Sequence, residues 1–172
     1  MPFNYNLSKL FIRVSTFFHH SDTGPSLYDR FKPFTPEDDR QHEDHSQAFI
    51  LTLRCSAAGS PLPKFRWTLD GQPLSGLDGV RLSEKVDNSP PFTRLVSELT
   101  IQRSQPRLSG VYECSAENLL GYVSHRARVD LAGSPFVRQM LNRKHIAGQS
   151  VLIDCPYGGY PLQSVQWFKG EC

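Results

Sequence analysis

The feature that most constrains the fold is a series of short segments in which apolar and polar residues alternate. In the first of them, Leu51, Leu53 and Cys55 are separated by the polar residues Thr52 and Arg54. Alternation with a period of two predicts strands that bury one face, and turn residues separate the segments. We therefore expect an all-β chain of antiparallel strands, over residues 48–57, 64–69, 80–86, 94–103, 110–117 and 122–131.

Two cysteines, a tryptophan and a tyrosine stand at particular places in these strands. Cys55 and Cys114 lie on two of them, Trp67 lies on a strand between, and Tyr112 stands two residues before the second cysteine. This order resembles the I-set immunoglobulin domain, a sandwich of two antiparallel sheets. The resemblance implies a disulfide between Cys55 and Cys114 through the core. It also implies that Trp67 packs on this bridge and that the Tyr112 hydroxyl binds nearby backbone.

Such a disulfide indicates an oxidising compartment and hence a secreted or cell-surface protein. The formal net charge of +2 and the interleaving of acidic and basic residues give no reason to expect a nucleic-acid partner. Residues 1–20 lack the uninterrupted apolar stretch of a signal peptide, and no segment approaches the ~20 apolar residues of a membrane span. We expect a fragment of a longer protein or an incomplete gene model.

The first 36 residues have no alternating pattern, and prolines such as Pro25 interrupt their second half. We expect residues 1–36 to be a disordered or mispredicted leader, followed by a first domain over residues 37–132. Within the leader, Asn6-Leu7-Ser8 matches the N-glycosylation triplet, which is common by chance.

No catalytic or metal-binding motif is found in the sequence. His42, Asp44 and His45 could be metal ligands, but they lack a recognisable spacing and a remote third ligand. We interpret them as a solvated approach to the first strand. His125 alternates with expected core positions, so we interpret it as a packed histidine rather than a catalytic base. We expect no enzyme activity, no cofactor and no metal.

An internal repeat predicts a second domain over residues 133–172. Five residues recur at an offset of 100, namely Cys55, Gly59, Pro61, Leu62 and Trp67 as Cys155, Gly159, Pro161, Leu162 and Trp167. The repeat predicts strands over 150–155 and 165–168, with Cys155 and Trp167 as core markers. The remaining strands of that domain, with a cysteine to pair with Cys155, would lie past residue 172. Cys172 falls just past the expected third strand and is a poor substitute partner.

Two stretches are similar to the Down syndrome cell adhesion molecule (Dscam) family. Residues 112–121, YECSAENLLG, resemble the hairpin between the last two strands of an I-set domain. Residues 133–138, GSPFVR, followed by Gly148-Gln149-Ser150, Cys155-Pro156, Gly159-Tyr160-Pro161 and Trp167, are similar to a junction between two domains of this family, especially of its arthropod members. The resemblance implies a single-pass receptor on the extracellular side of the plasma membrane that binds another copy of itself. It further implies a role in axon guidance and neurite self-avoidance.

The sequence departs from the family pattern at Leu108, where I-set domains usually carry an aspartate. That aspartate normally pairs with an arginine, here Arg81, which then needs another partner or stays solvated.

Two alternatives to homophilic adhesion remain: a structural spacer of a matrix or muscle protein, and an arthropod immune receptor. No binding residue follows from the pattern. Leu119, Leu120 and Tyr122 are apolar residues at an expected hairpin tip, so we expect them to contact the next domain or a partner. The short linker before Pro135 favours a semi-rigid arrangement of the two domains.

Overall fold

The computed structural model describes residues 23–36, 50–74, 76–102, 105–140, 142 and 144–168. These residues form mainly strands, as the alternating pattern predicts. In chain order the elements are β1 (Thr23–Leu27), β2 (Ile50–Ser60), β3 (Lys64–Leu69), β4 (Gln72–Pro73), β5 (Val80–Asp87), β6 (Arg94–Gln102), η2 (Pro106–Leu108), β7 (Gly110–Asn118), β8 (Gly121–Val129), β9 (Gly133–Val137) and β10 (Tyr157–Tyr160).

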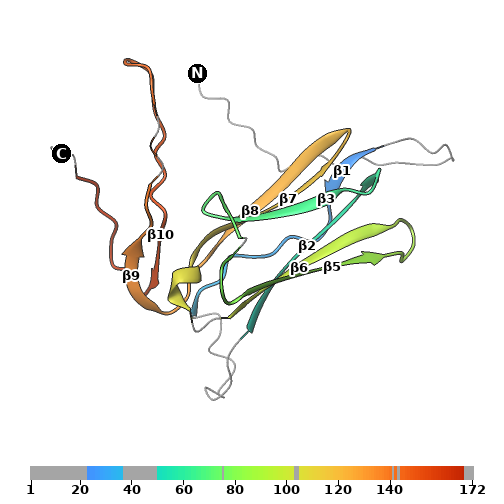
Figure 1. Ribbon diagram of the computed structural model, residues 1–172, viewed down its shortest axis with the longest axis horizontal. Coiled ribbons are helices and arrows are strands. Elements are labelled where there is room, and N and C mark those ends of the chain that lie inside the picture. The colour runs from blue at the N-terminus through green and yellow to red at the C-terminus, as the bar shows by residue number, and fades with distance from the viewer. Residues whose placement is uncertain are drawn as a thin grey trace.

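Eight of these strands form two facing antiparallel sheets (Figure 1). One sheet has the order β1-β2-β6-β5 and the other the order β4-β3-β7-β8. A disulfide between Cys55 on β2 and Cys114 on β7 joins the two sheets. This is the immunoglobulin-like sandwich that the sequence predicts.

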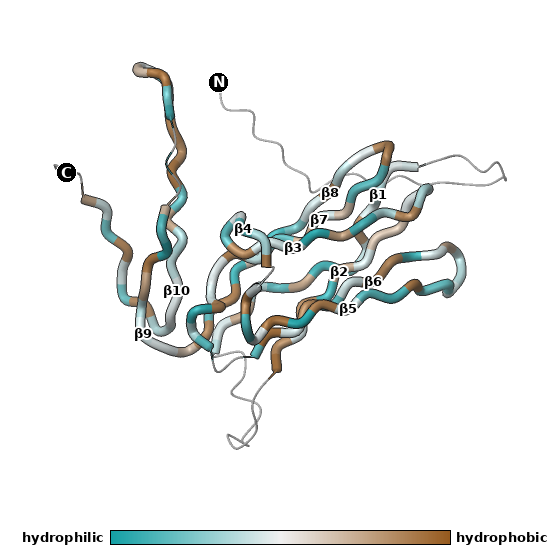
Figure 2. Tube along the Cα trace, in the orientation of Figure 1, coloured by the Kyte–Doolittle hydropathy of each residue, from teal (hydrophilic) through white to brown (hydrophobic). Residues whose placement is uncertain are grey.

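The core lies between the sheets and consists of the residues that the alternation places on the inner faces. Hydrophilic and hydrophobic residues alternate along the strands (Figure 2). The buried cluster contains Phe31, Leu53, Cys55, Trp67, Leu69, Leu99, Ile101, Leu108, Tyr112, Cys114, Ala127, Val129 and Leu131. All but Phe31 and Leu108 come from the alternating segments, so the alternation identifies most of the core correctly.

The expectation that residues 1–36 form a leader outside the sandwich is wrong for residues 23–36. Thr23–Leu27 forms β1 and pairs with the end of β2, and the chain then crosses to the other sheet, where Phe34 forms a parallel bridge with Val129. The side chain of Phe31 is buried against Trp67, with ring centroids 5.4 Å apart. Alternation cannot reveal this segment, because it is short, changes sheets and has a register shift between Thr23 and Ser26. Asn6, His42, Asp44 and His45 lie outside the described residues.

The pairing of β9 with β10 repeats the pairing of β1 with β2. In the first pair Thr23 lies opposite Ser60 and Leu27 opposite Ala57; in the second pair Gly133 lies opposite Tyr160 and Val137 opposite Tyr157. Both pairs also carry a register shift at the corresponding place. The β9–β10 pair is thus the same two-strand unit as the β1–β2 pair, as a repeated domain would require.

The strands expected over residues 150–155 and 165–168 are not formed. These residues are irregular, and Trp167 is 56% exposed, whereas Trp67 is 4% exposed. Cys155 is half-buried and carries a free thiol. A strand needs a hydrogen-bonding partner, and no strand among the described residues pairs with these two segments. Cys155 and Trp167 therefore match the repeat in sequence but have no core to enter here.

Candidate interaction site

Trp67, Tyr112 and Cys114, which the sequence predicts as core residues, lie together between the two sheets. Trp67 lies opposite Cys114 in the register of β3 and β7, and its Nε1 donates to Ser97 Oγ at 2.9 Å. Tyr112 Oη donates to the backbone oxygen of Leu108 at 2.7 Å, and burial raises the pKa of this phenol. Each polar atom is buried with a partner, so this cluster stabilises the sandwich and does not offer reactive groups to a substrate.

Leu108 replaces the usual aspartate by entering the core. It is 1% exposed and lies at the end of η2, where its carbonyl accepts the Tyr112 hydroxyl. Arg81 is exposed and has no ion pair within the described part of the chain. At this position the chain therefore has a buried apolar side chain, and Arg81 stays solvated.

Two arginines bind the β9–β10 segment to the end of the sandwich that carries η2. The Arg138 guanidinium binds the Asp70 carboxylate and the backbone oxygens of Arg107 and Ser109, the last at 2.8 Å. The Arg128 guanidinium lies 3.8 Å from the centre of the Tyr157 ring and donates to the Tyr157 carbonyl at 3.2 Å. Arg128 Nε also donates to Asp130 Oδ1 at 2.9 Å.

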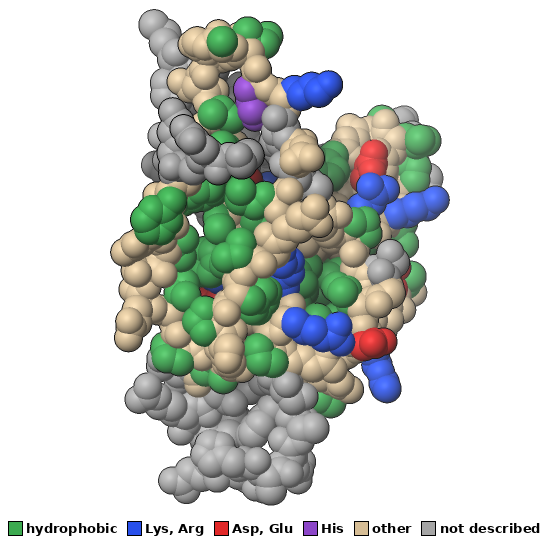
Figure 3. Space-filling model, turned by 60° about the vertical axis from the view of Figure 1, so that its left-hand side comes forward, with side chains coloured by type: hydrophobic (Ala, Val, Ile, Leu, Met, Phe, Trp, Pro, Cys, Tyr) green, Lys and Arg blue, Asp and Glu red, His purple; other side chains and the backbone are tan. Residues whose placement is uncertain are grey.

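Close backbone packing accompanies these contacts. At Gly133, which has φ +151°, a side chain would collide with the Pro106 ring, since its Cβ would lie 2.2 Å from Pro106 Cγ. At Gly158 a Cβ would lie 2.5 Å from the Phe136 ring and 2.8 Å from Ser109 Cβ. This end of the molecule faces forward in Figure 3, where hydrophobic side chains gather over the middle of the view. The junction is therefore a packed contact and not a bare linker.

The hairpin tip between β7 and β8 lies at the opposite end of the sandwich from β9 and β10 (Figure 1). It therefore does not contact the following segment, contrary to one of the two roles expected for it. Asn118 Nδ2 binds the carbonyls of Thr23 and Pro61 at 2.8 and 2.9 Å, which fixes the base of the hairpin. Beyond this base, Leu119 is 91% and Leu120 53% exposed, so these leucines form a supported apolar knob.

The outer face of the first sheet is covered by charges of alternating sign. Asp29, Arg54, Glu98 and Lys85 form a ladder in which successive ion pairs are 3.6, 3.9 and 3.6 Å long. Asp29, Arg54 and Lys85 are exposed and Glu98 is partly exposed, and such surface pairs contribute little to stability. The two acidic and two basic side chains of this ladder balance in charge.

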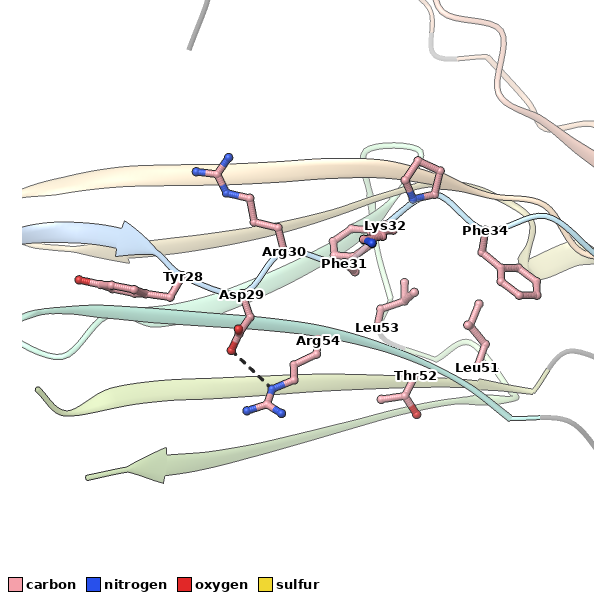
Figure 4. Close-up of a pocket in the computed structure, with 11 residues that line it drawn as sticks. Tyr28, Asp29, Arg30, Phe31, Lys32, Phe34, Leu51, Thr52, Leu53 and Arg54 are labelled. Carbon is pink, nitrogen blue, oxygen red and sulfur yellow. Dashed lines mark ion pairs between the residues drawn. The ribbon is translucent and has the colours of Figure 1, made fainter. Parts of the chain in front are cut away.

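A hollow lies between residues 28–34 and the first half of β2 (Figure 4). Its charged side chains do not converge: Arg54 turns to Asp29, while Arg30 points away from both. Beside it, His125 Nε2 lies 2.8 Å from the Phe31 carbonyl, and its ring meets the Phe31 ring edge-on at 5.0 Å. His125 is thus a packed histidine that holds the crossover segment, as the alternation indicates.

Neither a metal site nor a membrane-spanning helix is seen in the described ranges. No three His, Cys, Asp or Glu side chains there are close enough to hold a metal ion. No helix there is both long and apolar enough to cross a bilayer.

The fold and the cysteine bridge define the class of protein. The family model of the immunoglobulin domain matches residues 40–118. Over these residues the chain is therefore similar to the immunoglobulin domain in sequence, and its sandwich has the immunoglobulin-like fold.

Among curated proteins, the chain is similar to cell adhesion molecules of the Dscam group. It is 39% identical over 124 residues to the cell adhesion molecule DSCAM of Rattus norvegicus, which covers 72% of this chain and 6% of that protein. It is 30% identical over 138 residues to Dscam1 of Drosophila melanogaster, covering 80% of this chain and 7% of that protein. The vertebrate identity is the higher of the two, so these matches do not favour the arthropod type that the sequence analysis expected. The chain spans less than a tenth of the length of either relative.

Solved structures agree with this. The crystal structure of the N-terminal eight immunoglobulin domains of Down syndrome cell adhesion molecule isoform 1.30.30 aligns with a TM-score of 0.63 at 26% identity, covering 80% of this chain and 16% of that chain. The titin domains Z1Z2 in complex with telethonin align with a TM-score of 0.51 at 20% identity, covering 66% of this chain and 49% of that chain. The titin likeness shows the fold alone.

Proposed function

We propose that this chain is an extracellular, non-enzymatic recognition module of a Dscam-like receptor on the plasma membrane, and that it binds another copy of the same receptor. The proposal is carried by the 39% identity to a cell adhesion molecule over 124 residues. The bridge between Cys55 and Cys114 supports it, since such disulfides persist outside the cytosol. Axon guidance and neurite self-avoidance are the settings that we propose for such binding.

The knob of Leu119 and Leu120 is the surface that we propose for the contact. Contiguous exposed apolar residues favour protein contacts, and this pair stands on a hairpin held by Asn118. By contrast, the charged outer face of the first sheet would lose hydration of four charged groups on binding.

Bead aggregation tests both parts of the proposal. Beads of two colours, coated with the whole 172-residue chain, should form mixed clusters. Leu119→Ser with Leu120→Ser should abolish clustering. Leu82→Ser is the matched control, because Leu82 on β5 is 53% exposed, like Leu120, but lies away from the hairpin. Dispersed wild-type beads would contradict homophilic binding, and equal loss in the control would contradict the role of the knob.

A structural spacer of a matrix or muscle protein remains the second candidate. It is favoured by the packed junction, which would transmit force between the domains. A spacer predicts dispersed beads in the same assay.

A further inference from the structure

The carboxylate of Asp70 is held in a fixed position at the end of the first domain that faces β9 and β10. Asp70 and Gly71 have φ angles of +49° and +77°, which form the tight turn between β3 and β4. The backbone N–H of Val111 donates to Asp70 Oδ1 at 2.8 Å, and the backbone N–H of Asp70 donates to the Val111 carbonyl, also at 2.8 Å. One carboxylate oxygen is therefore used within the first domain, and the other, Oδ2, faces Arg138.

Arg138 joins both domains at once. Its backbone N–H donates to the Pro156 carbonyl at 2.7 Å, beside the pairing of β9 with β10. Its guanidinium reaches three acceptors on the first domain: the Asp70 carboxylate on the β3–β4 turn, the Arg107 carbonyl of η2 and the Ser109 carbonyl before β7. A planar guanidinium with five donors suits this set of acceptors, whereas an ammonium group does not.

We propose that Asp70 and Arg138 form an interdomain lock that fixes the direction in which the second domain leaves the first. The side chains are 7% and 24% exposed, so the charge pair is screened less by water and salt than the surface ladder. Opening the junction would leave the Asp70 carboxylate and two carbonyls without this partner.

A second contact makes the junction resist rotation as well as bending. Arg128 stacks on the Tyr157 ring, and Gly133 packs on Pro106, so the two domains also touch through residue pairs other than the Arg138 contact. Three separated contacts define an orientation, whereas a single contact leaves an axis of rotation. The lock concerns the shape of the chain and does not depend on homophilic binding.

Hydrogen exchange of the whole chain tests the lock. Asp70→Asn keeps a residue that tolerates positive φ and can still accept from Val111, but it removes the charge. We expect amide exchange in β9 and β10 to become at least about tenfold faster, as expected when an opening equilibrium loses a charge pair. Exchange in β2 and β6 should not change.

Asp78→Asn is the matched control, because Asp78 is 92% exposed and lies 3.9 Å from Arg107 without reaching the second domain. It should leave all exchange rates unchanged. Arg138→Gln should reproduce the effect of Asp70→Asn, and the double variant should be no worse than Arg138→Gln. Unchanged exchange in β9 and β10 in either single variant, or faster exchange spread evenly over β2 and β6, would overturn the lock. Neither result would bear on the bead assay.

Discussion

At the scale of single residues, Tyr112 shows how a buried polar group is retained. Its hydroxyl is enclosed in the core and donates to the Leu108 carbonyl at 2.7 Å. Tyr112→Phe should lower the free energy of unfolding by about 1–3 kcal/mol, because the carbonyl loses its donor while it stays buried. Urea unfolding measures this. Tyr122→Phe is the control, since Tyr122 is 60% exposed, and it should change stability by less than ~0.5 kcal/mol.

The stability of the fold in acid depends in part on the carboxyl group of Asp87. Hydrogen bonds from the Ser89 hydroxyl and amide, and then from Arg94, lower the pKa of Asp87 from 3.8 to about 2. Because the folded value is lower than the unfolded one, the ionised carboxylate stabilises the fold above pH ~4, and this contribution is lost as the pH falls toward 2. Carboxyl NMR should show the Asp87 midpoint near 2. In Ser89→Ala the midpoint should rise; a midpoint near 4 in the wild type would refute the prediction.

At the scale of elements, β1 and the crossover after it decide where the first domain begins. Phe31 is 7% exposed and packs on Trp67 and His125. Phe31→Ala should therefore cost about 3–5 kcal/mol in unfolding free energy, as for other buried aromatic residues. Lys32→Ala, at an exposed neighbouring position, should cost less than ~0.5 kcal/mol. Equal unfolding free energies for the two variants would show that this segment does not contribute to the core of the first domain.

Only part of this element could be found in the sequence. Pro135 of β9 lies 110 residues after Pro25 of β1, and the two strands have the same register to their partners. The cysteines Cys55 and Cys155 are instead 100 residues apart. A search for the repeat therefore finds β1 only if the segment between the first two strands may differ in length by ten residues. Phe31 has no periodic neighbours, because its burial depends on the crossing of the chain between the sheets.

At the scale of the whole molecule, the bridge between β2 and β7 holds the two sheets together. It closes a loop with a sequence separation of 59 residues, for which the chain-entropy model gives roughly 4 kcal/mol. Replacing both Cys55 and Cys114 by serine should lower the unfolding free energy by about that amount in denaturant titration. Cys155→Ser should change it little, because Cys155 carries a free thiol at the second domain. If the chain were instead a structural spacer in a cytosolic muscle protein, Cys55 and Cys114 should react as free thiols.

The sandwich and its inner faces follow from the amino-acid sequence, because they depend on a period of two along each strand, which is a local pattern. The bridge between Cys55 and Cys114, 59 residues apart, was predicted only through the resemblance to I-set domains. Only the tertiary structure shows that Asp70 meets Arg138, 68 residues later, and that the tip of the β7–β8 hairpin lies at the opposite end of the sandwich from β9 and β10. It also decided that Cys155 and Trp167 stay outside a core. Those outcomes depend on which segments lie side by side, and no local pattern encodes the approach of residues so distant in the chain.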